Sequence, residues 1–454
     1  MPRRYAPDPV VDRSLRYAVR DGVAYSVMHG AGELYFAAYA VFLKASTAQL
    51  AFLSAIPPLA GSLAQLLAAW LARRGLRRRP VMLAGVATQV LAWPPMLLLP
   101  FVFPQHAVPL FIACVVGYLA AGQLASPAWA SLMGDLVPPK RRGRFFAHRT
   151  RLMSLTGLAA LAAAGLTLHL ADGMHAELAG FALVFLAAAA ARTYSAYTLA
   201  RMHEPPPQAE AVVLPFRRET LVRLGRSRFA RFSLFNALMS FAVAMAGPFY
   251  ALYMLRDLGF TYLQLMAATA TAVATQFLSL PLWGRAADRF GSRAVILASG
   301  MVIPVATSLW AFAGQFWHVI GLQIIGGLGW AGYTLAVTNY LYESVEAPKR
   351  TTYFALNAVL AALGVFVGAM AGGALTQVVS AELALGPLAV TLPSALGAVF
   401  LISAALRVTL LLLLFRRLPE VRSTPLAGPD ARGWSAWAAL VFGGNATLRR
   451  RPRG

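Results

Sequence analysis

Stretches of roughly twenty mostly apolar residues follow one another along almost the whole 454-residue chain. A helix needs about 20 apolar residues to cross the hydrocarbon core of a bilayer, and no soluble core requires so many long apolar segments. We therefore predict an all-α integral membrane protein with twelve transmembrane helices. The expected spans are 22–43, 48–71, 80–103, 107–133, 152–171, 178–200, 231–254, 262–283, 294–313, 316–342, 353–378 and 390–415.

Composition agrees with a membrane location. The chain is 59% hydrophobic and 13% charged, with a mean hydropathy of +0.62. Charged residues at that level are too few to cover the surface of a soluble protein of this length. The first apolar stretch is long enough to span the membrane, so we do not expect it to be a cleaved signal peptide.

Positive charges set the orientation of the spans. Of the 40 Lys and Arg residues, 36 fall in alternating segments on one side, whereas the opposite loops hold only Lys44 and Arg256. Lysine and arginine are retained on the cytoplasmic side of membrane proteins. Both termini are therefore expected in the cytoplasm. The same rule explains the net charge of +23, so the charge is no evidence for nucleic-acid binding.

The longest cytoplasmic loop divides six spans from six. It runs from residue 201 to 230 and combines a proline-rich start with a basic stretch, which is typical of a linker lying on an anionic membrane surface. The predicted organisation is a first six-helix bundle (1–200), a cytoplasmic linker (201–230), a second six-helix bundle (231–418) and a cytoplasmic tail (419–454).

The two halves repeat each other. Pro139-Lys140-Arg141 recurs as Pro348-Lys349-Arg350 at a shift of 209 residues, and Arg192 recurs as Arg407 at a shift of 215. Both matches fall at corresponding places in the two sets of six spans. A parallel six-plus-six duplication is the repeat pattern of a large class of secondary transporters.

With this repeat, one loop motif resembles that of the major facilitator superfamily. The residues that carry the resemblance, in the pattern G-x-x-x-D-R-x-G-x-R, are Gly284, Asp288, Arg289, Gly291 and Arg293. In the first half, Ala68 and Ala72 stand where the family has glycine and aspartate. The resemblance implies the major facilitator fold, transport by alternating access, and a gating role for this motif.

Glu33 is the carboxylate nearest the middle of an expected span. An ionisable group near the bilayer midplane is costly and is a functional candidate by default. His29 lies one helical turn before it, and Tyr25 and Ser26 lie one turn further back. Two interpretations stay open: a proton-coupling or substrate site formed by Glu33 and His29, and a structural ion pair or hydrogen bond.

Arg192 and Arg407 are the two basic residues inside expected spans. Each precedes a cytoplasmic-end arginine by nine residues, which places it about 13 Å inside the membrane. Because the pair is repeated at matching depth, we expect a structural role shared by both halves. An ion pair between Glu33 and Arg192 is the alternative.

Further polar residues lie on the helices that, by the resemblance, line the central cavity. Few charges and several aromatic residues among them favour a neutral, cationic or amphipathic solute, and no arginine stands out as a cavity residue. Helix–helix hydrogen bonding is the competing interpretation for each of them. The candidates are Gln123, Ser126, Trp129, Asn236, Ser240, Tyr250, Gln323, Trp330 and Asn339.

The sequence holds no phosphate-binding loop, no Cys/His metal spacing and no prenyl-transfer motif, so we expect no ATP, metal, cofactor or enzymatic activity. The predicted function is secondary active transport of a small molecule in the bacterial inner membrane, with protons as the coupling ion. Export of a hydrophobic or cationic compound is favoured slightly. The alternatives are a symport or facilitative importer of a nutrient, and a transport-inactive sensor or assembly partner.

Overall fold

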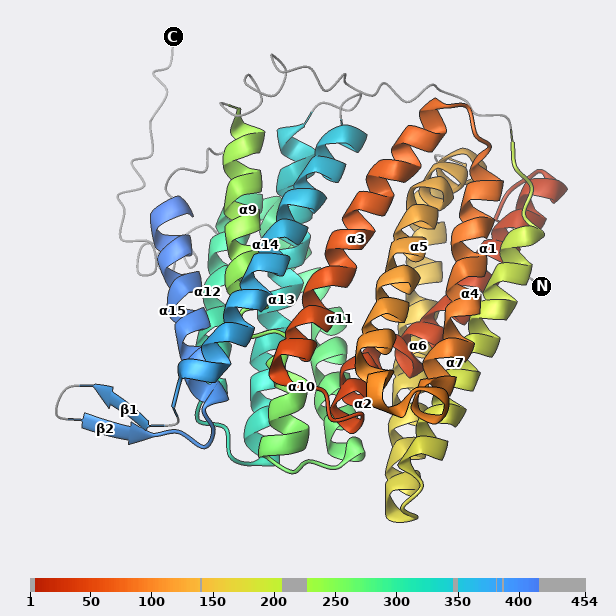
Figure 1. Cartoon of the computed structure of the whole chain (residues 1–454). Helices are drawn as coiled ribbons and strands as arrows, with labels where there is room; N and C mark the ends of the chain where they lie inside the picture. Colours follow the sequence, from red (N-terminus) through yellow and green to blue (C-terminus); the bar gives the residue numbers. More distant parts are fainter. Residues whose placement is uncertain are drawn as a thin grey trace, which may run out of the picture.

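The computed structural model describes residues 5–138, 141–205, 227–345, 350–380, 382–385 and 388–415. Within these residues the protein is built from helices and one small hairpin (Figure 1). Most of the predicted linker and the whole predicted tail lie outside the described residues, and so does part of the repeated Pro-Lys-Arg motif.

The amino-terminal half contains the elements from α1 to α7. They are α1 (Pro9–Ala31), a short 3-10 turn (Glu33–Tyr35), α2 (Phe36–Phe42), α3 (Thr47–Arg73), α4 (Arg78–Val102), a second 3-10 turn (Pro104–His106), α5 (Ala107–Leu136), α6 (Arg142–Gly173) and α7 (Glu177–Ala200).

The carboxyl-terminal half contains the elements from α9 to α15. They are α9 (Arg228–Ala244), α10 (Phe249–Leu252), a π-helical turn (Tyr253–Asp257), α11 (Tyr262–Phe290), α12 (Ser292–Trp310), α13 (Phe316–Ser344), α14 (Arg350–Val378), strands β1 (Glu382–Leu385) and β2 (Leu388–Thr391), and α15 (Leu396–Phe415).

Eleven helices among the described residues are long and apolar enough to cross a membrane. They coincide with eleven of the twelve expected spans. The remaining span, the first, is interrupted, because a 3-10 turn separates α1 from α2. The prediction of a multi-pass helical protein is therefore confirmed, and the first span differs from it in two respects.

The first difference is where α1 begins. The sequence predicts a span from residue 22, but the helix starts at Pro9, where Asp8 caps it by accepting a hydrogen bond from the backbone N–H of Val10. Asp12 in the first turn accepts a hydrogen bond from the N–H of Tyr5 at 2.5 Å. The prediction was wrong because hydropathy detects contact with lipid, whereas the first half of α1 packs against protein.

The second difference is the break after Ala31. The N–H of Gly32 still bonds to the carbonyl of Met28, and the next residue, Glu33, opens the 3-10 turn. A Cβ at position 32 would collide with the Trp93 ring, so glycine allows α1 to end against α4. Glu33 therefore occupies a helix interruption, where its backbone is free of the regular helical ladder.

The seventh expected span is interrupted at the corresponding place. Helix α9 ends at Ala244 and α10 begins at Phe249, after the pair Gly247-Pro248. Gly247 lies 215 residues after Gly32, the same shift that relates Arg192 to Arg407. Proline lacks an N–H and interrupts a helix. Each half thus begins with a broken helix, a feature that marks binding sites in several transporter folds.

Two helix pairs provide most of the contacts between the halves. Helix α3 packs against α14, where the hydroxyls of Thr47 and Thr376 lie 3.1 Å apart. Helix α6 packs against α11, where Gly165 leaves room for Met266. By the predicted topology, these four residues belong to the outer ends of their helices.

Helices α9 and α14 approach each other very closely inside the second half. Gly364, Gly368 and Gly372 lie on one face of α14, and a Cβ on any of them would overlap a backbone carbonyl of α9 or of the residue that caps it. Small residues of this kind let transmembrane helices pack by van der Waals contact, because lipid offers little hydrophobic driving force between helices.

We predict that Gly368→Val destabilises the protein by about 1–3 kcal/mol, because the new side chain pushes α9 and α14 apart. Thermal unfolding of the detergent-purified variant measures this change. Gly326→Val is the matched control, since nothing lies within 4 Å of the position of its Cβ. Equal melting temperatures for the two variants would contradict the close packing described above.

A hairpin between α14 and α15 is the one non-helical element that the described residues show. Strands β1 and β2 pair antiparallel, with Glu382 opposite Thr391 and Leu385 opposite Leu388, and they project beyond the helices in Figure 1. The sequence predicts helices and loops only. The hairpin was missed because its strands are only four residues long, too short for a clear alternating pattern.

Candidate functional site

Glu33 lies at the break between α1 and α2 and both of its carboxylate oxygens have partners. Oε2 lies 2.6 Å from Nδ1 of His29, and Oε1 accepts a hydrogen bond of 2.6 Å from the hydroxyl of Tyr118 on α5. The Glu33 side chain is 13% exposed, whereas that of His29 is 45% exposed. His29 is therefore much more exposed than the carboxylate that it contacts.

The predicted grouping around Glu33 is present. The ring of Tyr25 stacks on that of His29 at a centroid distance of 6.2 Å, so the two aromatic residues share the side of α1 that meets Glu33. Ser26 points to a different neighbour, since its hydroxyl lies 2.6 Å from that of Thr156 on α6.

A second shielded carboxylate, Asp21, was missed by the sequence analysis. It is 4% exposed, and it pairs with Arg149 on α6 at 3.3 Å. Arg149 also donates a hydrogen bond to the carbonyl of Ala18 and covers the ring of Trp129 at 4.5 Å. Asp21 was overlooked because α1 was expected to begin after it. Glu33 consequently shares the membrane interior of this half with another carboxylate.

Arg192 belongs to the same polar group. It donates hydrogen bonds to Gln89 on α4 and to the hydroxyl of Ser195, which in turn donates to Asp21 at 2.7 Å. Its guanidinium also lies 5.4 Å from the centre of the Tyr25 ring. Glu33 and Arg192 do not form the alternative ion pair in this structure. Glu33 contacts His29 and Tyr118, whereas Arg192 bonds to Gln89 and Ser195.

These side chains line a cavity of about 390 Å³ inside the amino-terminal half. Helices α1, α4, α5, α6 and α7 all contribute to its wall. The expectation that no arginine lies in a cavity is wrong, since two do. The lining residues are Asp21, Tyr25, Glu33, Met82, Val86, Gln89, Leu119, Gly122, Gln123, Ala125, Ser126, Trp129, Arg149, Met153, Arg192 and Leu199.

Part of this set was among the residues singled out in the sequence. Tyr25, Gln123, Ser126 and Trp129 were candidates for a central cavity and Glu33 for a proton or substrate site, and all five line this cavity of the amino-terminal half. Gln89 and Arg149 had no such signal. Gln89 lies on the third span, for which no cavity residue was predicted, and Arg149 was attributed to a cytoplasmic loop, whereas it lies in the third turn of α6.

The candidates of the carboxyl-terminal half do not reach this cavity. Asn236 is buried on α9, and Tyr250 on α10 packs on Trp310 and Phe400. The half-buried Trp330 meets Tyr333 edge-on. The other three candidates, all half-buried on α9 and α13, are Ser240, Gln323 and Asn339.

Arg407 is the counterpart of Arg192, and its surroundings differ. It is 1% exposed and donates hydrogen bonds to Thr307 at 2.6 Å and to the carbonyl of Val243 at 3.3 Å. Val243 belongs to the last turn of α9, whose carbonyls carry partial negative charge. Arg407 therefore caps the broken helix, while Arg192 joins a network with a carboxylate.

The loop motif lies at the junction of α11 and α12. Gly291 adopts a φ of 83°, which favours glycine, and caps the end of α11. Gly284, Asp288 and Arg289 belong to the last turns of α11, and Arg293 belongs to the first turn of α12. Asp288 is exposed, and among the described residues no ion pair is found for it.

We predict that Asp288→Ala slows transport several-fold while expression and thermal stability stay close to wild type. An exposed carboxylate adds little to stability, so we expect Asp288 to act through a contact that forms when the two halves close on this side. Arg285→Ala, on the same exposed helix end, is the control. If Asp288→Ala transports like the wild type, the motif has no gating role, and its arginines serve only to orient the helices in the membrane.

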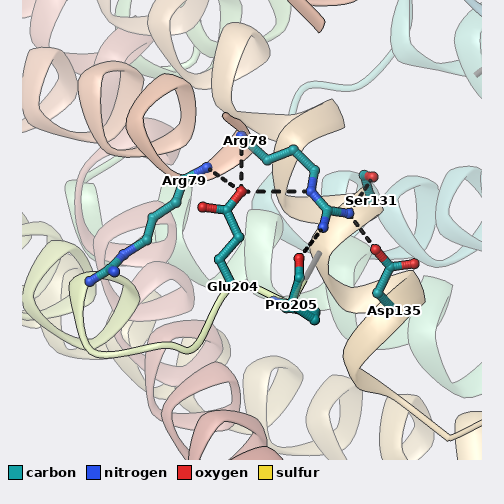
Figure 2. A network of polar contacts seen from close by, with 6 residues as sticks. All are labelled: Arg78, Arg79, Ser131, Asp135, Glu204 and Pro205. Carbon is teal, nitrogen blue, oxygen red and sulfur yellow. Dashed lines mark hydrogen bonds and ion pairs between the residues drawn. The ribbon is translucent and has the colours of Figure 1, made fainter. Parts of the chain in front are cut away.

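A polar network in the first half joins α4, α5 and the segment that follows α7 (Figure 2). Arg78 at the start of α4 pairs with Asp135 on α5 at 2.5 Å and donates to the carbonyl of Pro205 at 3.0 Å. Glu204 accepts hydrogen bonds from the first N–H groups of α4, where a helix terminus favours negative charge. In the second half, Ser292 donates to Glu343 at the corresponding place.

Comparison with known proteins decides the family. The model described as Major Facilitator Superfamily matches residues 22–239 and again 232–452, one match for each half. The chain belongs to the Major Facilitator Superfamily. This membership confirms the resemblance seen in the loop motif, and it makes the protein a membrane transporter and not an enzyme.

Curated relatives of this transporter match over limited stretches. It is 32% identical over 101 residues to "Tetracycline resistance protein, class C" of Escherichia coli. The matched stretch covers 22% of this chain and 25% of the relative. It is 29% identical over 114 residues to a "Multi-drug resistance efflux pump PmrA homolog" of Lactococcus lactis, 25% of this chain and 27% of the relative. The matches thus span about a quarter of each of these relatives.

Solved structures share the fold. A bacterial homologue of the lysosomal transporter Spinster, inward-facing and unoccupied, matches with a TM-score of 0.67 at 16% identity, over 92% of this chain and all of the other. The nucleoside transporter NupG matches with a TM-score of 0.67 at 12% identity, over 89% of this chain and 98% of the other. At such identities the likeness concerns the fold alone.

Proposed function

We propose that this transporter is proton-coupled and that Glu33 is the group that exchanges the proton. The observation that carries the proposal is the placement of Glu33 between the cavity and His29. One carboxylate oxygen contacts the half-exposed His29, and the residue itself lines the cavity wall. A proton can thus reach the carboxylate through the imidazole, and its arrival changes the charge of the cavity.

Energetics are adequate for this coupling. At a membrane potential of about 150 mV, one proton moving inward releases about 3.5 kcal/mol. That energy sustains a concentration gradient of a few hundred-fold for the coupled solute. No nucleotide-binding motif occurs in the sequence, so an ion gradient is the energy source that we propose.

We further propose that the transported solute is a hydrophobic or cationic compound and that transport is outward, across the bacterial inner membrane. The support is the tetracycline-resistance and multidrug-efflux relatives, together with the mixed apolar and polar lining of the cavity. The rivals are a symport or facilitative importer, and a sensor that keeps the fold without transport. The cytoplasmic location of both termini stays a prediction, and so does the division of the chain into four segments.

Flux in proteoliposomes tests the proposal. Tetracycline is the first probe because one relative is named for it, and a thermal-shift screen of drugs and metabolites supplies further ones. We expect an imposed pH gradient to drive accumulation, and an uncoupler to abolish it. An importer would accumulate its ligand when the proton and the ligand move in the same direction. A sensor would bind a ligand and show no flux at all.

A further inference from the structure

Tyr118 is the partner of Glu33 that comes from a different helix. Its hydroxyl on α5 donates a hydrogen bond of 2.6 Å to Oε1 of Glu33, whereas His29, which contacts Oε2, lies one turn before Glu33 on α1. Helix α1 packs mainly against α6 and α7, and far less against α5. The bond from Tyr118 is therefore a direct link between the broken first span and α5.

The surroundings of Tyr118 fix the position of its ring. The side chain is 0% exposed, and Phe36 on α2 and Trp93 on α4 meet the ring edge-on, at centroid distances of 5.7 Å and 5.3 Å. The hydroxyl also lies 3.0 Å from the sulfur of Met28. It has only one proton to donate, and a carboxylate is a much stronger acceptor than a thioether. We therefore assign that proton to the bond with Glu33.

The strength of this bond depends on the charge of Glu33. A hydrogen bond to an ionised acceptor is roughly twice as strong as one between neutral groups. Uptake of a proton by Glu33 thus weakens its contact with Tyr118 and loosens the link between the helix break and α5. Helix α5 packs against α3, and α3 packs against α14 of the other half, so this link leads to the contact between the halves.

We propose that Tyr118 is a positioning residue for proton coupling. It holds the ionised carboxylate of Glu33, and it converts protonation of that carboxylate into a weaker link between the first span and α5. The inference rests on the proposed function, because it takes Glu33 for the group that exchanges the proton. It adds the residue through which the proton acts on the helices.

Thermodynamic reciprocity makes this coupling measurable. The free energy by which protonation weakens the bond equals the free energy by which the bond opposes protonation. A change in the pH at which Glu33 takes up its proton, caused by changing Tyr118, therefore reports the coupling itself. The other titratable or charged side chains that contact Glu33 or share its cavity wall are His29, Tyr25, Asp21, Arg149 and Arg192, and the change at position 118 leaves all of them in the protein.

Infrared difference spectra of the full chain in lipid nanodiscs, recorded as a function of pH, test the proposal. The signal is the carboxyl band that Glu33→Gln removes. Tyr118→Phe keeps the ring and removes the donor, so we expect the band to appear about one pH unit higher than in the wild type, which is about a tenfold tighter hold on the proton. Replacement of Tyr118 by 3-fluorotyrosine makes the hydroxyl a stronger donor and should move the band to lower pH.

Tyr39→Phe is the matched control. Tyr39 is 1% exposed and donates a hydrogen bond of 3.2 Å to the carbonyl of Met96, so this variant loses a buried hydroxyl that does not bond to Glu33. Its band should stay at the wild-type pH. The fluorinated variant retains the native hydrogen bond, so it decides the question even if Tyr118→Phe does not fold.

A band that stays at the wild-type pH in the Tyr118 variants, or that moves equally in Tyr39→Phe, would overturn the role of Tyr118 and leave the proposed function of Glu33 in place. A wild type that shows no band from Glu33 would overturn both. The two failures are therefore distinguishable.

Discussion

Glu33→Gln is expected to abolish pH-driven accumulation of solute in proteoliposomes. Glutamine has the shape of the protonated carboxyl and can still contact His29 and Tyr118, but it cannot release a proton. Exchange of labelled against unlabelled solute should therefore continue, because exchange needs the alternating movement of the two halves without net proton transfer. The drop in concentrative transport should exceed about 100-fold, the size of the gradient that one proton supports.

The control is Glu177→Gln at the start of α7, a carboxylate that does not line the cavity. It should transport like the wild type. Proton-driven accumulation by a stable Glu33→Gln protein would contradict the proposed role of Glu33. It would direct attention to Asp21, the other carboxylate of the cavity wall.

Asp21→Ala is expected to destabilise the protein by about 3–5 kcal/mol, because it leaves Arg149 buried without its counter-ion. The pair is well shielded, with side chains 12% and 5% exposed. The double variant Asp21→Ala/Arg149→Met should regain much of that loss, since it buries no unpaired charge. Thermal or chemical unfolding of the purified variants measures both values.

Arg16→Ala provides the comparison for this ion pair. Arg16 pairs with Asp12 at 2.9 Å on the same helix, but its side chain is 39% exposed. An exposed pair contributes about 0–1 kcal/mol, so this variant should stay close to the wild type. If the double variant at positions 21 and 149 were no more stable than Asp21→Ala, the loss would come from something other than the unpaired charge.

The number and order of the long helices could be predicted from the sequence because lipid imposes a simple rule, a run of about twenty apolar residues. The rule fails where a helix is covered by protein. The part of α1 before residue 22 contains Asp12, Arg16 and Asp21, and each of these charged residues has a partner on α1 or on α6. In the sequence alone these partners are not known, so residues 9–21 have the composition of a polar loop.

The candidate site was predictable only as far as single helices allow. Glu33 and His29 lie one turn apart, so their contact follows from helical geometry. The contacts of Arg149 with Asp21 and of Arg192 with Gln89 join residues more than 100 positions apart. Such pairs depend on the angles at which helices cross, which side-chain patterns in one sequence do not specify.

The most direct test of the central claim follows the protonation of Glu33 itself. Infrared difference spectra of the purified protein, recorded while pH is lowered, detect the carbonyl stretch of a carboxyl group as it takes up a proton. We expect a band from a buried carboxyl group in the wild type and in Asp21→Asn, and its loss in Glu33→Gln. A band that persists in Glu33→Gln and disappears in Asp21→Asn would contradict the account and assign the proton to Asp21.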